Sequence, residues 1–464
     1  MKKELFVQRS RIEAPAADVF RWHARPGAFE RCNPPWNPVK IIERSPGVAV
    51  GATTTITVPI GPFRKRWVAE HVECEDGRLF RDVQRSGPFA SWDHLHVMEP
   101  EGPDACFLED RVEYALPMGA LGRFFAGKSV RRQLERTFAY RHETLKHDMA
   151  AQRSCRGGST GTIVVSGASG MVGSALIPLL TTGGHPVRRL VRKPTPTDAD
   201  AIAWDPATGA IDPAKLDGVE CLVHLAGDNI ASGRWTAAKK ARILESRAAV
   251  TRKLCDTLAR MDHPPKTLVS ASAIGFYGNR GDEILTEDSG PGTGFLADVC
   301  RQWEEATRAA VEKGMRVVNL RFGVILDPRG GALAKMLFPF RMCGGGVIGD
   351  GRQAMSWITL DDAVGAIHHA LHDERMRGPV NGVAPNPVGN REFTKTLGGV
   401  LRRPAILPMP AFAARLAFGE MADALLLASA RVHPTRLLAG GYVFRHAKLE
   451  DGLRHLLGRR LRSE

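Results

Sequence analysis

One short stretch, residues 162–173, restricts the fold of this chain more than any other. It opens with the β-branched run Thr162-Ile163-Val164-Val165 and continues into glycines at a G-x-x-G-x-x-G spacing. Residues 174–180 then follow with helical periodicity, so the pattern predicts a strand, a tight turn and a helix. Glycines let such a turn approach an anion, and the N–H groups of the helix N-terminus favour a phosphate. We therefore predict that Gly167, Gly170 and Gly173 form a phosphate-binding loop, the alternative being a turn without a ligand.

From residue 162 onward, apolar strand candidates alternate with helical patterns. We expect strands at 163–166, 187–191, 221–225, 267–271 and 317–320. This alternation is typical of an α/β fold, a Rossmann-type doubly wound parallel sheet with helices on both faces. We assign residues 162–397 to this domain and residues 398–464 to a small helical C-terminal extension.

Residues 1–150 predict a separate α+β unit. Short alternating stretches indicate several strands, a short helix begins near Pro15, and a long helix is expected from about Leu121 to Met149. Its expected inward positions are Phe124, Phe125, Leu134, Phe138 and Leu145. Residues 151–161 have the composition of a linker between the two units.

Composition narrows the class of protein. The chain has 464 residues and a formal net charge of +14, but its arginines are dispersed and no zinc-finger spacing accompanies them. We therefore expect no nucleic-acid partner, and an anionic cofactor and solvated faces account for the charge. The eight cysteines form no C-x-x-C pair, and charged residues interrupt the apolar segment near residue 420. These features predict a cytoplasmic protein without a membrane span.

The beginning of the first unit resembles a known superfamily. Residues 10–20, Ser-Arg-Ile-Glu-Ala-Pro-Ala-Ala-Asp-Val-Phe, and the following Trp22-His23 and 26–29 resemble SRPBCC, or START-like helix-grip, proteins. In that superfamily a curved sheet wraps the last helix around an apolar cavity. The resemblance implies a hydrophobic ligand in the N-terminal domain, and a filled core without a ligand is the open alternative.

Motifs spread over residues 162–385 resemble those of extended short-chain dehydrogenases/reductases of the NAD-dependent epimerase/dehydratase kind. Besides the glycine loop they include 224–227 (His-Leu-Ala-Gly), 270–278 (Ser-Ala-Ser-Ala-Ile-Gly-Phe-Tyr-Gly) and 356–362. The tail from about 398 resembles the C-terminal domain of unknown function found in one epimerase-like subgroup. The resemblance implies nucleotide binding. The implied cofactor contacts are Gly167, Ser169, Gly170, Met171, Val172, Gly173, Arg192, Lys193, Leu225, Ala226, Gly227 and Arg321.

The end of the second expected strand indicates which nicotinamide cofactor is preferred. Enzymes that prefer NAD usually place an acidic residue there, whereas a basic residue suits the 2′-phosphate of NADP. Here the strand runs into Arg192-Lys193, and no carboxylate appears before Asp198. We therefore predict NADP(H), with Arg192 as the phosphate contact; a solvated basic turn is the alternative.

The proton-transfer residues depart from the family pattern. Related enzymes carry a Ser or Thr and a Tyr-x-x-x-Lys pair, in which the lysine lowers the pKa of the tyrosine. Ser272 occupies the serine position, but the helix expected from about Phe295 to Glu304 contains neither tyrosine nor lysine. The standard mechanism therefore does not carry over.

Three substitutes for that mechanism stay open. Tyr277 acts as acid or base, with Arg321 as its cationic neighbour; Asp298 or Cys300 contributes from the altered helix; or no redox step occurs. For Tyr277, packing alone is an equally open interpretation. For His224 the sequence favours a packed core histidine.

A glycine-rich segment, residues 344–357, borders the substrate in similar proteins. Arg352, Gln353 and Trp357 are the predicted substrate contacts, with a plain surface loop as the alternative. Asp361 and Asp362 are interpreted first as residues of a helix start.

The leading functional hypothesis is an NADP(H)-binding oxidoreductase or nucleoside-diphosphate-sugar-epimerase-like enzyme that acts on a small polar substrate, with Ser272 and Tyr277 as candidate catalytic residues. An N-terminal module would bind an apolar ligand. The alternative is a non-catalytic, NADP(H)-sensing regulatory protein, which the missing Tyr-x-x-x-Lys pair favours.

Overall fold

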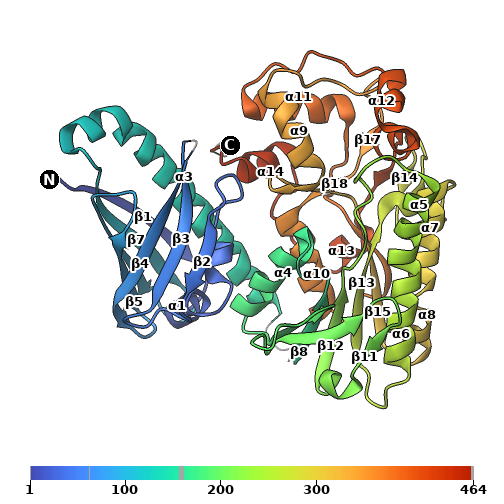
Figure 1. The fold of residues 1–464 in the computed structure, drawn as a ribbon, viewed down its shortest axis with the longest axis horizontal. Helices are drawn as coiled ribbons and strands as arrows, with labels where there is room; N and C mark the ends of the chain where they lie inside the picture. The colour runs from blue at the N-terminus through green and yellow to red at the C-terminus, as the bar shows by residue number, and fades with distance from the viewer. Residues whose placement is uncertain (1, 62, 156–160, 461–464) are drawn as a thin grey trace. The chain divides into compact units, whose positions relative to one another are not determined.

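The computed structural model describes residues 2–61, 63–155 and 161–460. The chain divides into two compact units, one formed mainly by residues before 156 and the other mainly by residues after 160 (Figure 1). Within the described residues, no helix combines the length and apolar character that crossing a membrane requires.

The first unit is an antiparallel sheet with one long helix. The elements are β1 (Glu4–Ile12), α1 (Ala16–Ala24), α2 (Ala28–Arg31), β2 (Lys40–Arg44), β3 (Thr53–Ile60), β4 (Phe63–Glu75), β5 (Leu79–Ser86), β6 (Ser91–Pro100), β7 (Cys106–Ala115) and α3 (Gly119–Ser154). The sheet order is β1-β7-β6-β5-β4-β3-β2. This architecture confirms the predicted helix-grip type of fold.

Helix α3 buries only its later turns. Leu134 and Phe138 pack against Phe6 and Val112, and Leu145 belongs to a second cluster around α1. The prediction for Phe124 and Phe125 was wrong, because these side chains are 82% and 80% exposed. Figure 1 shows the reason, since the first turns of α3 extend past the ends of the strands.

The predicted linker needs a second correction. Residues 151–154 complete α3 instead of leaving it, in keeping with the helix-forming residues Ala151, Gln152 and Arg153. Residues 156–160 of the predicted linker lie outside the described residues.

The second unit is an α/β fold. Its main elements are β8 (Thr162–Ser166), α4 (Met171–Thr182), β9 (Val187–Val191), β10 (Ala201–Asp205), β11 (Ala210–Ile211), β12 (Val219–His224), α5 (Ala237–Leu244), α6 (Val250–Ala259), β13 (Thr267–Ala273), β14 (Ile284–Leu285), α7 (Phe295–Glu305), α8 (Arg308–Glu312), β15 (Arg316–Phe322), β16 (Val324–Asp327), α9 (Gly331–Arg341), β17 (Ala354–Met355), β18 (Trp357–Thr359), α10 (Leu360–His372), β19 (Gly378–Gly382), β20 (Val388–Gly389), α11 (Asn390–Leu401), α12 (Ala411–Phe418), β21 (Arg431–Val432), α13 (Thr435–Ala439) and α14 (Leu449–Leu456).

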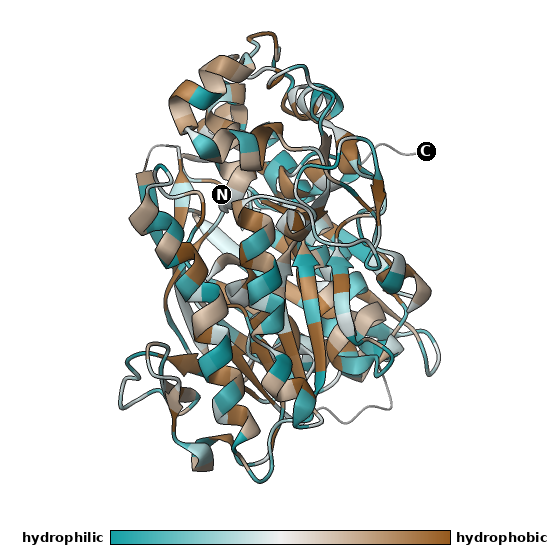
Figure 2. Ribbon diagram, turned by 90° about the vertical axis from the view of Figure 1, so that its right-hand side faces the viewer, coloured by the Kyte–Doolittle hydropathy of each residue, from teal (hydrophilic) through white to brown (hydrophobic). Residues whose placement is uncertain are grey.

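The main sheet of this unit has the order β11-β10-β9-β8-β12-β13-β15-β19. All of its pairings are parallel except that of β10 with β11. Every residue of β15 is buried, as a strand covered on both faces requires. Figure 2 shows the same contrast, with hydrophobic colour along the central strands and mixed colours along the helices. The predicted Rossmann-type sheet is confirmed, although β10, β11 and β19 were not among the expected strands.

Candidate cofactor and catalytic site

The glycine loop connects β8 to α4. Gly167 has a left-handed φ of +70°, and a Cβ there would lie 2.7 Å from the carbonyl carbon of Leu225. A Cβ on Gly173 would lie 2.4 Å from the carbonyl oxygen of Gly167. Only glycine fits both positions, so the turn packs tightly against the end of β12. Ser169 and Gly170 at its tip are exposed, directly before the N-terminus of α4.

Two neighbouring strands end beside this loop. Strand β9 runs into Arg192 and Lys193, and β12 runs into 225–227. Because β9, β8 and β12 are adjacent and parallel, their carboxyl ends share one edge of the sheet. The structure thus brings the predicted loop, the basic turn and 225–227 together. This edge is where ligands of doubly wound folds bind.

The basic turn is available to a ligand. Arg192 and Lys193 are exposed, and among the described residues neither makes a hydrogen bond or an ion pair. The next carboxylate, Asp198, accepts a hydrogen bond from Arg189 at 2.5 Å. The end of β9 therefore offers free cationic side chains, while its nearest acidic group is already paired.

His224 is a packed core residue. Its Nδ1 lies 2.7 Å from Ser166 Oγ and its Nε2 lies 3.0 Å from Thr251 Oγ1. Burial lowers the pKa of His224 to about 4, so the imidazole is neutral near pH 7. The interpretation of His224 as a core histidine is confirmed.

Ser272 belongs to a buried polar cluster at the end of β13. Its Oγ donates a hydrogen bond to Glu304 Oε1 at 2.7 Å. Arg321 donates two hydrogen bonds to the same carboxylate, each 2.8 Å long. The Arg321 guanidinium also stacks on Phe276, 3.5 Å from the ring centre. The arrangement is a bidentate ion pair with a serine attached to it.

Tyr277 closes this cluster from the other side. Arg321 Nη1 donates to its hydroxyl oxygen at 2.9 Å, and the hydroxyl faces Asn381 Oδ1 at 2.7 Å and the Thr286 carbonyl oxygen at 2.9 Å. The side chain is fully buried. Burial raises the pKa of Tyr277, and the nearby Arg321 offsets this only in part. The expected pairing with Arg321 is present, but the hydroxyl is enclosed and hard to ionise.

Asp298 and Cys300 on α7 are not prepared for proton transfer. Asp298 is exposed and accepts a hydrogen bond from Arg301 at 3.2 Å. Burial raises the pKa of the Cys300 thiol to about 12. The residue that α7 does contribute is Glu304, which was not among the predicted site residues. Glu304 lies four residues after the buried Cys300, which places both on the same face of α7. This spacing is the sequence signal that could have indicated Glu304.

The predicted substrate contacts do not lie on one surface. Trp357 is fully buried, its Nε1 donates to the Asn386 carbonyl oxygen at 3.0 Å, and its ring packs in a core cluster with Phe393. Gln353 donates to the carbonyl oxygens of Ile348 and Leu426. These contacts show that Trp357 is a core residue. They also show that Gln353 joins the segments around Ile348 and Leu426. Arg352 is exposed and stays a predicted contact.

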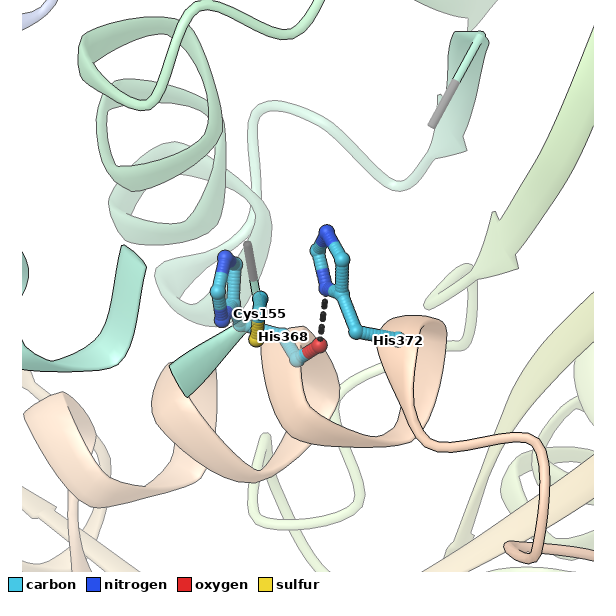
Figure 3. A group of neighbouring side chains, drawn as sticks. All are labelled: Cys155, His368 and His372. Atoms are coloured by element: carbon cyan, nitrogen blue, oxygen red, sulfur yellow. Dashed lines mark hydrogen bonds between the residues drawn. The ribbon is translucent and has the colours of Figure 1, made fainter. Parts of the chain in front are cut away.

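Helix α10 carries acidic and histidine side chains with structural roles. Thr359 Oγ1 caps the helix by accepting from the Asp362 N–H, and Asp361 and Asp362 lie in the first turn, as interpreted. Further along, His372 Nδ1 donates to the carbonyl oxygen of His368 at 2.7 Å (Figure 3). Burial lowers the pKa of both histidines.

Comparison with known proteins agrees with this geometry. Residues 163–381 match the NAD dependent epimerase/dehydratase family, 12–138 match the family of polyketide cyclase / dehydrase and lipid transport, and 409–456 match a domain of unknown function, DUF1731. An epimerase family protein of Mycobacterium bovis is 42% identical over 291 residues, which are 63% of this chain and 96% of that protein.

Two solved structures extend the comparison. The nucleoside-diphosphate sugar epimerase from Corynebacterium glutamicum is 35% identical, with a TM-score of 0.79 over 98% of this chain and 90% of that one. Human epimerase family protein SDR39U1, isoform 2, solved with NADPH, is 34% identical, with a TM-score of 0.59 over 64% of this chain and 99% of that one. The chain therefore belongs to the epimerase family of NAD-dependent epimerase/dehydratase proteins, and it carries a polyketide cyclase-like domain before the Rossmann domain.

Proposed function

We propose that the second unit is an NADP(H)-dependent oxidoreductase or epimerase-like enzyme that acts on a small polar substrate. The observation that carries the proposal is the turn at Gly167, which only glycine can form, beside the unpaired Arg192 at the same sheet edge. The human relative solved with NADPH supports the choice of cofactor. The substrate class follows the Corynebacterium relative, named as a nucleoside-diphosphate sugar epimerase.

The residues present fit a dinucleotide. The exposed tip at Ser169 and Gly170 and the N-terminus of α4 would receive the pyrophosphate, since helix N–H groups and the positive end of the helix dipole favour anions. Leu225, Ala226 and Gly227 would line the ribose, and Arg192 and Lys193 would pair with a 2′-phosphate. A bound nicotinamide would supply or accept a hydride.

Ser272 is the proposed contact to the reacting oxygen of the substrate. Strand β13, which carries it, is adjacent and parallel to β12, so Ser272 and 225–227 share the carboxyl edge of the sheet. Glu304 fixes the Ser272 hydroxyl in one orientation. Tyr277 enters the proposal as a positioning residue, because its hydroxyl is buried and its pKa is raised.

The test begins with cofactor binding. NADPH and NADH are titrated by fluorescence into the full chain, into Arg192→Ala and into Arg188→Ala. We expect tighter binding of NADPH, and Arg192→Ala should weaken NADPH by roughly tenfold with little change for NADH, since a hydrogen bond to a charged group contributes about 1.5–3 kcal/mol. Arg188 is the control, because it lies on the same strand and its side chain is engaged with the Lys215 carbonyl oxygen at 2.6 Å. Equal affinities for both cofactors in the wild type would contradict the proposed preference.

Turnover is tested next on carbonyl and nucleotide-sugar substrates. Ser272→Ala should lose most of kcat while its NADPH affinity is retained, and Ser272→Thr, which keeps the hydroxyl, should retain activity. NADPH binding without turnover on any of these substrates would refute the enzymatic proposal.

The first unit supports a second proposal, the binding of an apolar ligand. A cavity of about 740 Å³ lies inside this unit, and its walls include Phe80, Trp92, Leu108 and Phe138. Such a volume suits a small organic molecule. We place both activities in the cytoplasm, as the cysteine pattern predicts.

A further inference from the structure

The cavity of the first unit holds a cluster of histidines and carboxylates on one face of the sheet. Asp82 on β5 pairs with His94 on β6, and His96 on β6 pairs with Asp110 on β7. Residues two apart on a strand point to the same face, so all four side chains meet there. All four line the cavity, and their side chains are 4–16% exposed. Polar groups this buried require partners.

Three atoms of the cluster have the spacing of metal ligands. Asp82 Oδ2 lies 3.3 Å from His94 Nδ1 and 3.7 Å from His96 Nε2. The three residues can each offer one ligand atom so that these atoms all lie within 4.8 Å of one another. A tetrahedral zinc ion with bonds of about 2.0–2.1 Å holds its ligand atoms roughly 3.3–3.4 Å apart. Two imidazole nitrogens and one carboxylate oxygen are also a ligand set that zinc enzymes use.

The second carboxylate of the cluster is placed to orient these ligands. His94 Nε2 lies 3.1 Å from Asp110 Oδ1, and His142 Nε2, on α3, lies 2.6 Å from Asp110 Oδ2. His96 Nδ1 is 2.6 Å from Asp110 Oδ1 but outside hydrogen-bonding geometry. Metal-bound histidines commonly direct their other ring nitrogen at a carboxylate, which fixes the tautomer and the ring orientation. Asp110 occupies that position for both histidines.

The carboxylates of this cluster have different charge partners from another buried carboxylate of the same unit. Asp148 accepts two hydrogen bonds from Arg31, 2.8 and 2.9 Å long. In the described part of the chain, Asp82 and Asp110 form ion pairs with histidines alone. Of the surrounding ring nitrogens, His142 Nδ1 has no hydrogen-bond partner among the described residues. A divalent cation would supply the missing positive charge.

We propose that Asp82, His94 and His96 bind a zinc ion in the cavity of the first unit, with Asp110 and His142 holding the ligands in place. Three protein ligands leave a coordination position open, as in catalytic zinc sites. That position faces a cavity with apolar walls, so it takes a carbonyl or hydroxyl oxygen of the apolar ligand. The site adds a Lewis acid to a unit proposed above only as a binding module.

The experiment uses the full chain, stripped with a chelator and dialysed against Zn²⁺ in the presence of excess Mg²⁺. Elemental analysis should find one zinc more in the wild type than in Asp82→Asn, His94→Gln or His96→Gln. Asp110→Asn should keep the site and weaken zinc affinity by roughly 10–100-fold. The matched control is His71→Gln, which lies in the same cavity on β4 but outside the three-ligand set, and which should retain the zinc.

A spectroscopic measurement identifies the ligands independently of stoichiometry. Co²⁺ in this site should give visible d–d bands without the near-ultraviolet band of thiolate coordination. Addition of acetohydroxamate, an oxygen ligand, should shift these bands if the fourth position is open. Circular dichroism reports whether each variant is folded. Equal zinc in the wild type and the ligand variants, or d–d bands that the ligand variants keep in full, would overturn the site, and unshifted bands would overturn the open position.

Discussion

Two polar clusters of this protein are each built around carboxylates and differ in how completely they are satisfied. In the second unit, Glu304 and Arg321 neutralise each other, and Ser272 and Tyr277 complete the network. In the first unit, Asp82 and Asp110 face histidines, some ring nitrogens lack partners, and the groups line a cavity of about 740 Å³. A cluster that satisfies itself stabilises a fold, whereas one that leaves buried atoms unmatched beside open space is prepared for a ligand.

Removal of Arg321, the cation of the cluster in the second unit, should give the largest effect on unfolding free energy. Arg321→Met leaves Glu304 buried without its charge partner, so we expect a loss of about 3–5 kcal/mol in unfolding free energy. Urea unfolding, followed separately for the two units, measures it. Arg301→Met, at the exposed pair with Asp298, is the control and should cause no measurable change. A loss as small as that of the control would show that the cluster does not stabilise the fold.

The substitution Tyr277→Phe distinguishes a structural role of this residue from a catalytic one. Tyr277→Phe removes the hydroxyl that accepts from Arg321 and faces Asn381, so buried polar atoms lose a partner at a cost of about 1–3 kcal/mol. We expect this loss in urea unfolding, with NADPH affinity unchanged. The opposite result, abolished turnover with unchanged stability, would identify Tyr277 as the proton-transfer group.

What the sequence could predict of the second unit depended on whether a feature is set by neighbouring residues or by distant ones. The glycine loop and the strands of the second unit follow local patterns, and the positive φ of Gly167 belongs to the turn itself. The environment of Trp357 and Tyr277 depends on segments far away in the chain, namely Asn386 and Asn381. Local patterns therefore assigned Trp357 to a glycine-rich loop, whereas it opens β18, and they could not show that either aromatic residue is buried.

The histidine cluster was missed for a related reason. His94 and His96, two apart on β6, already indicate a shared face from their spacing alone. Their partners Asp82 and Asp110 come from neighbouring strands, and strand register depends on the whole sheet. The H-x-H spacing was therefore a usable signal, whereas the carboxylates around it required the structure.

The pH dependence of unfolding tests the Asp82–His94–His96–Asp110 cluster of the first unit without metal. Burial opposes the charged form of His94, but Asp110 and Asp82 face its two ring nitrogens and raise its pKa to about 9. The unfolded value is about 6.5. A raised folded pKa gives stability that is fully present below about pH 6.5 and is lost as pH rises through about 9. Unfolding of the first unit, measured in chelator across this range, should therefore shift to lower urea as pH rises.

The matched control for this titration is His94→Gln, which removes the titrating ring. Its unfolding midpoint should vary less between about pH 6.5 and 9 than that of the wild type, because the imidazole with the raised pKa is gone. The second unit is an internal reference, because the cluster around His94 belongs to the first unit alone. If both units of the wild type showed the same pH dependence, or if the variant kept the full slope, His94 would not carry its charge in the folded cluster.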